Sequence, residues 1–217
     1  MAIAITKPEV FIIESLDVDD ELHHREGEVL SRTLTMSGKH PIYRYIRTKK
    51  ELIKFVAEFK RSRYRYLHLS VHGNKDLIAL TYDHLSAEEF AEIVGPALRG
   101  RRLFLSTCRA TNKSLAKAVF GKGGCISVAG PVHKIGFGDA AIFWSSFYHL
   151  MFKRADALEK IGNGRRMLNA DIKQVVTHLA LAIEQPFRLF LPDQDAGAKA
   201  RLLPAKGTVP LRERVEE

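Results

Sequence analysis

Apolar residues along the chain form short runs that alternate with longer segments of helical periodicity. The short runs are rich in β-branched and aromatic residues, are bounded by turn-forming residues, and have the length of buried strands. They lie at residues 9–15, 41–46, 66–71, 102–108, 125–132 and 187–192. The segment 75–84 has the pattern of an extended stretch or a small hairpin.

Between these runs, apolar residues recur every three or four positions, as on one face of an amphipathic helix. The clearest helix begins at Thr48, where Thr48 and Glu51 have the spacing of a capping box. Ser86 and Glu89 repeat that signature at the start of a second helix. Further helices are expected at 19–38, 112–124, 138–154 and 165–184.

This alternation predicts an α/β fold, a three-layer sandwich in which helices cover both faces of a mostly parallel central sheet. We expect one domain over residues 1–192 and a polar, flexible C-terminal tail over 193–217. In such sheets ligands bind beyond the carboxyl ends of the strands. The residues that directly follow each strand are therefore the first candidates for a site.

Two of the predicted strands end in reactive side chains. "YLHLSV" leads into His72 and Gly73, and "LFLST" leads into Cys108, with one helix and its turns between them. A cysteine attacks as its thiolate, and a neighbouring imidazole can take the proton. Backbone N–H groups of Gly73 and Cys108 can then stabilise the oxyanion of the attacked carbonyl. We predict His72 and Cys108 as a catalytic dyad, with Gly73 and Cys108 forming the oxyanion hole.

The remaining cysteine and histidines have simpler explanations. A lone histidine at a strand end is usually a capped surface imidazole, and a lone cysteine there usually packs in the core. A site is indicated only because two consecutive βα units end in such residues. Cys125 opens an apolar strand and is expected to be inert, and His68 lies inside a strand and is expected to be structural. His23 and His24 are adjacent and point to different faces of a helix, a poor arrangement for a metal. We predict no metal and no cofactor.

Composition and charge limit the partners and the cellular compartment that we expect for this chain. The chain has 217 residues, of which 46% are hydrophobic, and a net charge of +9. Its basic residues are spread over helix ends and strand flanks, so we do not expect nucleic acid as a partner. Two cysteines favour a reducing compartment, the first residues lack the apolar centre of a signal peptide, and no apolar run approaches the ~18 residues of a membrane span. We expect a cytoplasmic protein without membrane association.

The ordered set of motifs resembles the caspase-like cysteine peptidases of clan CD, and among them the CHAT-domain subgroup that is related to separase. Thr107 stands where that subgroup usually has alanine or glycine, and "AGPVHKIGFGD" lacks the tryptophan that often follows the fifth strand. The order and spacing agree over about residues 64–170. The segments that carry the resemblance are "YLHLSVHG" (66–73), "LSAEEFAEIV" (85–94), "LFLSTC" (103–108), "CISVAGPV" (125–132) and "AAIFWSSFYHLM" (140–151).

The resemblance implies a cysteine endopeptidase (a thiol protease) with His72 and Cys108 as the dyad and Gly73 beside the oxyanion hole. It also implies a protein substrate and control by an activating or sensor protein. Bacterial members of the subgroup commonly act in defence, including antiviral defence, or in cell death.

Specificity in these relatives depends on a pocket to which the segment after the fifth strand contributes. Here that segment carries one acid, Asp139, which could pair with an arginine or lysine before the scissile bond. Asp139 could instead be the N-cap of the next helix. Arg109, beside the nucleophile, could favour an acidic residue instead. We expect cleavage after a basic residue.

Two other classes of function stay open. A magnesium phosphatase of the haloacid-dehalogenase type would use Asp17 and Asp19 after the first strand, and "LFLST" resembles its second motif. Its acidic pair on a later loop is missing, and "DVDD" also suits a turn that starts a helix. A non-catalytic caspase-like interaction module is the other alternative, and the presence of both His72 and Cys108 argues against it.

Overall fold

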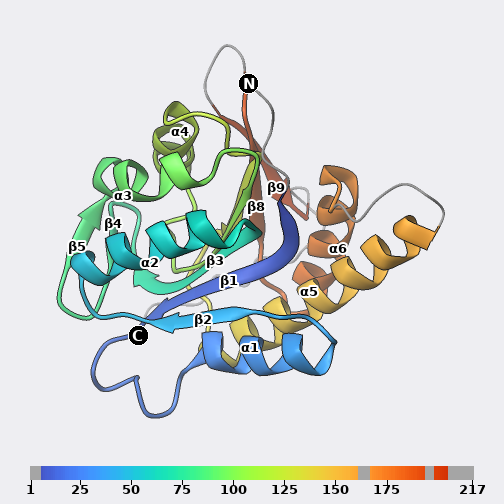
Figure 1. Cartoon of the computed structure of the whole chain (residues 1–217), viewed down its shortest axis with the longest axis horizontal. Coiled ribbons are helices and arrows are strands. Elements are labelled where there is room, and N and C mark those ends of the chain that lie inside the picture. The colour runs from blue at the N-terminus through green and yellow to red at the C-terminus, as the bar shows by residue number, and fades with distance from the viewer. Residues whose placement is uncertain (1–5, 161–166, 194–197, 205–217) are drawn as a thin grey trace.

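Strands and helices alternate along the chain as the hydrophobic pattern predicts. The computed structural model describes residues 6–160, 167–193 and 198–204, and its elements are labelled in Figure 1. The strands are β1 (Lys7–Ser15), β2 (Ile42–Tyr45), β3 (Tyr64–Gly73), β4 (Leu77–Ala79), β5 (His84–Ser86), β6 (Arg102–Ser106), β7 (Ser127–Pro131), β8 (Phe187–Leu191) and β9 (Lys199–Leu203). The helices are α1 (Glu26–Met36), α2 (Lys49–Ser62), α3 (Ala87–Val94), the short 3-10 helix η1 (Gly95–Ala97), α4 (Lys113–Gly121), α5 (Phe137–Lys160) and α6 (Asn169–Ala182).

The sheet has the strand order β2-β1-β3-β6-β7-β8-β9. Strands β2, β1, β3, β6 and β7 run parallel to their neighbours, whereas β8 and β9 are antiparallel additions at one edge. Strands β4 and β5 form a small hairpin that pairs with the end of β3, as the pattern of 75–84 predicts. The mostly parallel sheet and its helices confirm the predicted α/β sandwich.

Capping residues start the helices at the positions that the sequence indicates. The Thr48 side chain accepts a hydrogen bond from the Glu51 N–H, and the Glu51 carboxylate accepts one from the Thr48 N–H. Ser86 and Glu89 make the same reciprocal pair at the start of α3. Each box satisfies N–H groups that have no partner within the helix, so both predicted capping boxes are confirmed.

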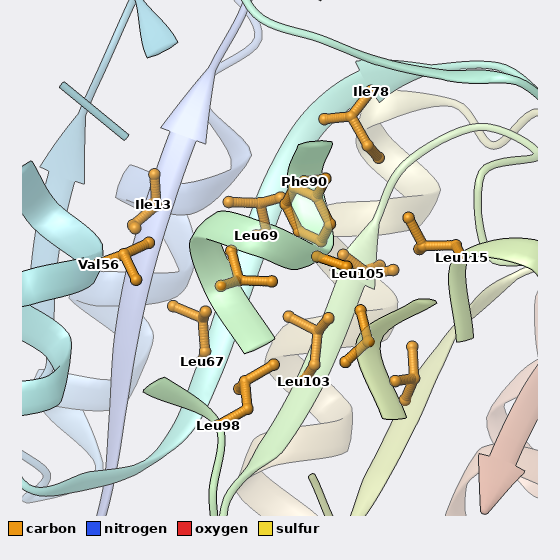
Figure 2. Packing of buried hydrophobic residues seen from close by; sticks show 14 of the residues in the cluster. Ile13, Val56, Leu67, Leu69, Ile78, Phe90, Leu98, Leu103, Leu105 and Leu115 are labelled. Atoms are coloured by element: carbon orange, nitrogen blue, oxygen red, sulfur yellow. The ribbon is translucent and has the colours of Figure 1, made fainter. Parts of the chain in front are cut away.

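Alternating side chains of the central strands divide the core into two layers. On one face, Leu67 and Leu69 of β3 and Leu103 and Leu105 of β6 pack against α2, α3 and α4 (Figure 2). On the other face, residues such as Phe104 pack against the buried aromatic side chains of α5 and against α6. The two helix groups, α2 to α4 and α1 with α5 and α6, can be followed in Figure 1. Burying each such side chain contributes ~1.5–3 kcal/mol to the stability of the fold. The strand ends therefore extend from a well-packed core.

Helix α1 begins later than the pattern predicts. The expected helix spans 19–38, but α1 starts at Glu26 and the preceding residues form turns. The carbonyl of Asp17 accepts the N–H of Asp20, and the carbonyl of Asp20 accepts those of His23 and His24. Aspartate favours such turns because its short side chain offers hydrogen bonds that compete with the helix. This loop follows β1 directly.

Part of the predicted tail is a strand. Residues 199–203, within the segment expected to be a flexible tail, form β9 along the edge of β8. Ala198 and Leu203 are buried there, while Lys199 and Arg201 are exposed. Edge strands of sheets often carry charged side chains that point outward. Because this segment is short and its exposed residues are charged, its sequence resembles that of a polar tail. Residues 205–217 lie outside the described part of the chain.

Candidate active site

The carboxyl ends of β3 and β6 lie side by side at one edge of the sheet. Ser70 of β3 is the register partner of Ser106 of β6. His72 lies two residues beyond Ser70, and Cys108 lies two residues beyond Ser106. The structure thus brings the two predicted residues to neighbouring strand ends, where open α/β sheets bind ligands.

The His72 imidazole is held by the loop that follows β1. Its Nε2 lies 3.0 Å from Asp20 Oδ2 and 3.9 Å from Asp17 Oδ2. The other oxygen of Asp20, Oδ1, lies 2.9 Å from Nδ1 of His24. The side chain of His72 is 28% exposed, so the ring is oriented by protein yet open to a substrate. One carboxylate therefore joins two imidazoles.

An aromatic ring completes the wall beside the imidazole. Phe137, the first residue of α5, lies edge-on to His72 at a centroid distance of 5.7 Å and stacks on His24 at 4.3 Å. Flat packing of this kind restricts the rotamers of both imidazoles. The start of α5 is therefore part of the candidate site.

Cys108 occupies a tight turn between β6 and α4. It is a free, partly exposed thiol. The carbonyl of Cys108 accepts the N–H of Ala110 at 2.7 Å, and Arg109 between them has a φ of 56°. Asn112 caps α4 through Oδ1 and donates from Nδ2 to the carbonyl of Lys75 at 2.8 Å. The cysteine turn is thereby tied to the loop that follows His72.

Within the described residues, no hydrogen bond joins His72 to Cys108. Within this part of the chain, the polar contacts of the imidazole go through Nε2 to the two aspartates. Nδ1 is the ring nitrogen that this pairing leaves for another partner. The two groups share an edge of the sheet, and their direct contact stays a prediction.

Gly73 permits a close approach of two backbones. A Cβ at this position would lie 2.5 Å from Thr107 Oγ1, 2.9 Å from the Leu77 carbonyl oxygen and 3.3 Å from Ala110 Cβ. Gly73 is not among the glycines with positive φ, so space and not backbone conformation requires glycine here. The larger residue before Cys108, Thr107, fits because Gly73 has no side chain.

Within the described residues, the backbone N–H groups of Gly73 and Cys108 are not used by the hairpin or by the turn. Asn74 donates to the Leu77 carbonyl, which makes these two the hydrogen-bonded pair at the end of the hairpin. Pairs alternate along an antiparallel ladder, so the next pair, Gly73 with Ile78, is the non-hydrogen-bonded one. The Gly73 N–H therefore points away from β4. Among the described residues, the Cys108 N–H also makes no hydrogen bond, which suits the predicted oxyanion hole.

Asp139 lies close to the site along the chain but on a different side of the helix. It is the third residue of α5 and is partly buried, in the first turn and not at the N-cap position. Helical residues two positions apart do not face each other, and Phe137 is the residue directed to His72. A carboxylate in the first turn also stabilises the helix dipole. The carboxylates that the structure places at His72 are those of Asp17 and Asp20.

Sequence reasoning missed the residues that surround His72. Asp17 and Asp20 were expected only as part of a turn that starts a helix, Asp17 also as a phosphatase residue, and His24 as part of that helix. The signal was their position: they follow β1, and β1 is the direct neighbour of β3 in the sheet. No local pattern could have shown that Phe137 reaches back to the same place.

The same groups form a set of donors that could hold a metal ion. One atom each of Asp17, Asp20 and His72 lie within 4.8 Å of one another, and they are the one such group among the described residues. Carboxylate and imidazole donors suit divalent transition metals. The hydrogen bond between Asp20 and His72 accounts for this proximity without an ion. A divalent cation here would occupy Nε2 of the imidazole.

The other reactive side chains are buried as expected. Cys125 is buried, and burial raises the pKa of its thiol to about 12. Its Sγ lies 3.4 Å from the Ser127 carbonyl oxygen. His68 is fully buried, with Nδ1 3.3 Å from the hydroxyl of Tyr148. Both are therefore part of the core.

Comparison with known proteins adds little to this geometry. The chain matches no protein-family model and no curated protein. Among solved structures it is similar to that of a candidate oxidoreductase from Pseudomonas putida KT2440, with a TM-score of 0.35 and 13% identity over 83% of this chain and 71% of that chain. A similarity at that level carries no argument about function. None of the helices in the described residues is long and apolar enough to cross a membrane.

Proposed function

We propose that the protein is a cysteine endopeptidase whose reacting pair is Cys108 and His72. The observation that carries the proposal is the register of β3 and β6, in which Ser70 pairs with Ser106, and His72 and Cys108 each follow two residues later. The resemblance to caspase-like CHAT-domain peptidases supports the same pair. Asp20 is added as a positioning residue because it holds Nε2 of His72 at 3.0 Å.

The proposed reaction uses these groups in order. The Cys108 proton passes to His72, and the thiolate attacks the carbonyl carbon of the scissile peptide, forming a C–S bond while the carbonyl electrons move onto oxygen. The N–H groups of Gly73 and Cys108 stabilise that oxyanion. The C–N bond then breaks, and the imidazolium gives its proton to the leaving amine. Water hydrolyses the thioester with His72 as base, which restores the thiol.

The proposed substrate is a protein cut after a basic residue. Asp139 is the acid on the segment after the fifth strand, and Asp17 offers a carboxylate that is 64% exposed beside His72. An opposite feature lies on the other side of the nucleophile. Burial, and then the charges of Arg109 and Arg188, lower the pKa of His133. The two guanidinium groups near this imidazole would favour an acidic residue.

The cellular setting in this proposal rests on the resemblance alone. It comprises a cytoplasmic location, an activating or sensor protein as partner, and a role in a regulated defence or cell-death pathway. The alternative is a non-catalytic interaction module of the same fold, which would need neither the thiol nor the imidazole.

The test compares variants of the pair on a library of fluorogenic peptides. We expect Cys108→Ala and His72→Ala each to abolish cleavage while the circular dichroism spectrum stays unchanged, because thiol and base act as a unit. Cys125→Ala is the matched control and should retain activity, since that thiol is buried. Iodoacetamide should label Cys108 well before Cys125. Full cleavage by either dyad variant, or labelling of Cys125 first, would show that the site is wrong.

A second candidate, metal-dependent phosphatase chemistry, is favoured by the Asp17, Asp20 and His72 donor set alone. A chelator separates the two reactions. The peptidase should keep its activity in EDTA, whereas phosphate release from p-nitrophenyl phosphate in the presence of Mg²⁺, lost in EDTA and in Asp17→Asn, would favour the phosphatase.

A further inference from the structure

A row of polar side chains crosses the sheet directly beneath the candidate site. Glu14 of β1 is the register partner of Ser70 of β3, and Ser70 is the partner of Ser106 of β6. Glu14 and the two serines are buried at 0%, 2% and 5% exposure. Alternate residues of a strand share a face, so Ser70 lies on the same face as His72, one step deeper in the fold.

One carboxylate from another element joins the two serines. Glu26, the first residue of α1, is 4% exposed, and its Oε2 accepts the hydroxyl of Ser70 at 3.0 Å and that of Ser106 at 2.7 Å. The carboxylate thereby bridges β3 and β6 two residues before His72 and Cys108. It is the last side-chain tie between these strands, among the described residues, before the chains diverge into the candidate site.

The other groups that face this carboxylate come from β1, β3 and α5. Glu26 Oε1 makes no hydrogen bond among the described residues and lies 3.5 Å from Nε2 of the buried His68, whose Nδ1 faces Tyr148. Glu14 accepts the Gly27 N–H and the Tyr43 hydroxyl. Burying a carboxylate is costly even when it is paired, and well-packed apolar residues often serve stability better. Its value here therefore lies in geometry and not in stability.

We propose that Glu26 is a positioning residue for the candidate site. By holding Ser70 and Ser106 on a single oxygen, it fixes the separation of the ends of β3 and β6 and so the distance between the His72 imidazole and the Cys108 thiol. This inference rests on the proposed function, because it concerns the distance between the two residues of the proposed dyad. Rigid support of this kind is what keeps a reacting pair within a few tenths of an ångström of its working geometry.

The test measures the alkylation of Cys108 by iodoacetamide as a function of pH, in a Cys125→Ala background with a single thiol. Glu26→Ala should slow alkylation at neutral pH by about tenfold and move the pH–rate profile to higher pH, because the imidazole is no longer held beside the thiol. Glu26→Gln, which keeps the shape and an accepting oxygen, should restore most of the rate. The double variant Ser70→Ala/Ser106→Ala should match Glu26→Ala. Glu14→Gln, a buried carboxylate in the same row without a contact to β6, is the control and should leave the profile unchanged.

His72→Ala in the same background separates the two claims. If His72→Ala shifts the profile and Glu26→Ala with the double serine variant do not, the positioning role is overturned and the dyad stands. If His72→Ala also leaves the profile unchanged, there is no pair to position and both claims fall. A loss of thermal stability in Glu26→Ala and in the double serine variant, with an unchanged profile in both, would show a merely structural carboxylate.

Discussion

At the residue scale, the carboxylate of Asp20 is the group that orients the His72 imidazole. Asp20 holds Nε2 of His72 through Oδ2 and Nδ1 of His24 through Oδ1. A charged acceptor fixes both the tautomer and the orientation of an imidazole, since the nitrogen that faces it carries the proton. Nε2 therefore carries its hydrogen toward Asp20, and Nδ1 is the ring nitrogen that can act as the base.

Replacing Asp20 by asparagine should lower kcat by about 10²-fold, in the range of a disturbed general base. The amide keeps the shape of the side chain but can present its NH₂ group to the ring and favour the wrong tautomer. The measurement is steady-state cleavage of the best peptide from the library. Asp19→Asn is the matched control, because Asp19 is an exposed aspartate of the same loop that makes no contact with the ring within the described residues. Equal activity of both variants and wild type would remove Asp20 from the mechanism.

Gly73 gives a second residue-scale prediction. Gly73→Ala keeps the N–H but forces a Cβ to within 2.5 Å of Thr107 Oγ1 and 2.9 Å of the Leu77 carbonyl, so the donor must move. We expect kcat to fall by about 10²-fold, as on loss of an oxyanion donor, and the free energy of unfolding to fall by about 1–3 kcal/mol. Adding Thr107→Ala removes one of the two clashes and should recover part of both losses. An active and fully stable Gly73→Ala protein would contradict the oxyanion role.

At the element scale, the strand ends were predictable and the loops between them were not. The apolar runs located β1, β3 and β6, and the spacing of Thr48 with Glu51 located the start of α2, because both signals are local. The turn that holds Asp20 and the late start of α1 depend on contacts with His72 and Phe137, which are distant in sequence. Lys199–Leu203 was missed as a strand because an edge strand needs only one apolar face, and the charged residues of this segment suggest solvent.

The β1–α1 unit carries a buried carboxylate that makes folding stability depend on pH. Burial, opposed by hydrogen bonds from Gly27 and Tyr43, raises the pKa of Glu14 to about 7. The unfolded chain releases this proton near the ordinary value of about 4.3, so the folded state binds more protons between these two pH values. Stability must therefore fall as pH rises from about 4.5 to about 7.

Glu14→Gln should remove this contribution, which is on the order of 3 kcal/mol across that window. Urea unfolding at several pH values compares the variant with wild type, and the variant should show the flatter stability profile between pH 4.5 and 7. Glu21→Gln is the contrasting control, since Arg47 lowers the pKa of that partly buried carboxyl to about 2 and its removal acts outside this window. Parallel profiles for wild type and Glu14→Gln would show that Glu14 is ionised in the folded protein.

At the scale of the whole molecule, charges of opposite sign flank the candidate nucleophile. The loop after β1 brings Asp17 and Asp20 to one side, and the turn after β6 and strand β8 bring Arg109 and Arg188 to the other. Topology creates this division, because each group follows or lies on a different strand of the same sheet. If the residue before the scissile bond binds on the acidic side, the enzyme selects a basic residue, and if it binds on the cationic side, the enzyme selects an acidic one.

We expect Arg- and Lys-ended fluorogenic peptides to be cut with higher kcat/KM than Asp-ended ones. A carboxylate beside the site binds a guanidinium with both charge and geometry, and the net charge of +9 is carried mostly by dispersed surface groups. Asp139→Asn and Asp17→Asn, assayed separately, identify the acid that is used, because only that variant should lose the basic preference, by about tenfold or more. Arg188→Gln is the matched control on the cationic side and should leave the preference intact. A preference for Asp-ended peptides that is lost in Arg188→Gln would instead assign the pocket to the cationic side and overturn the expectation of a basic residue.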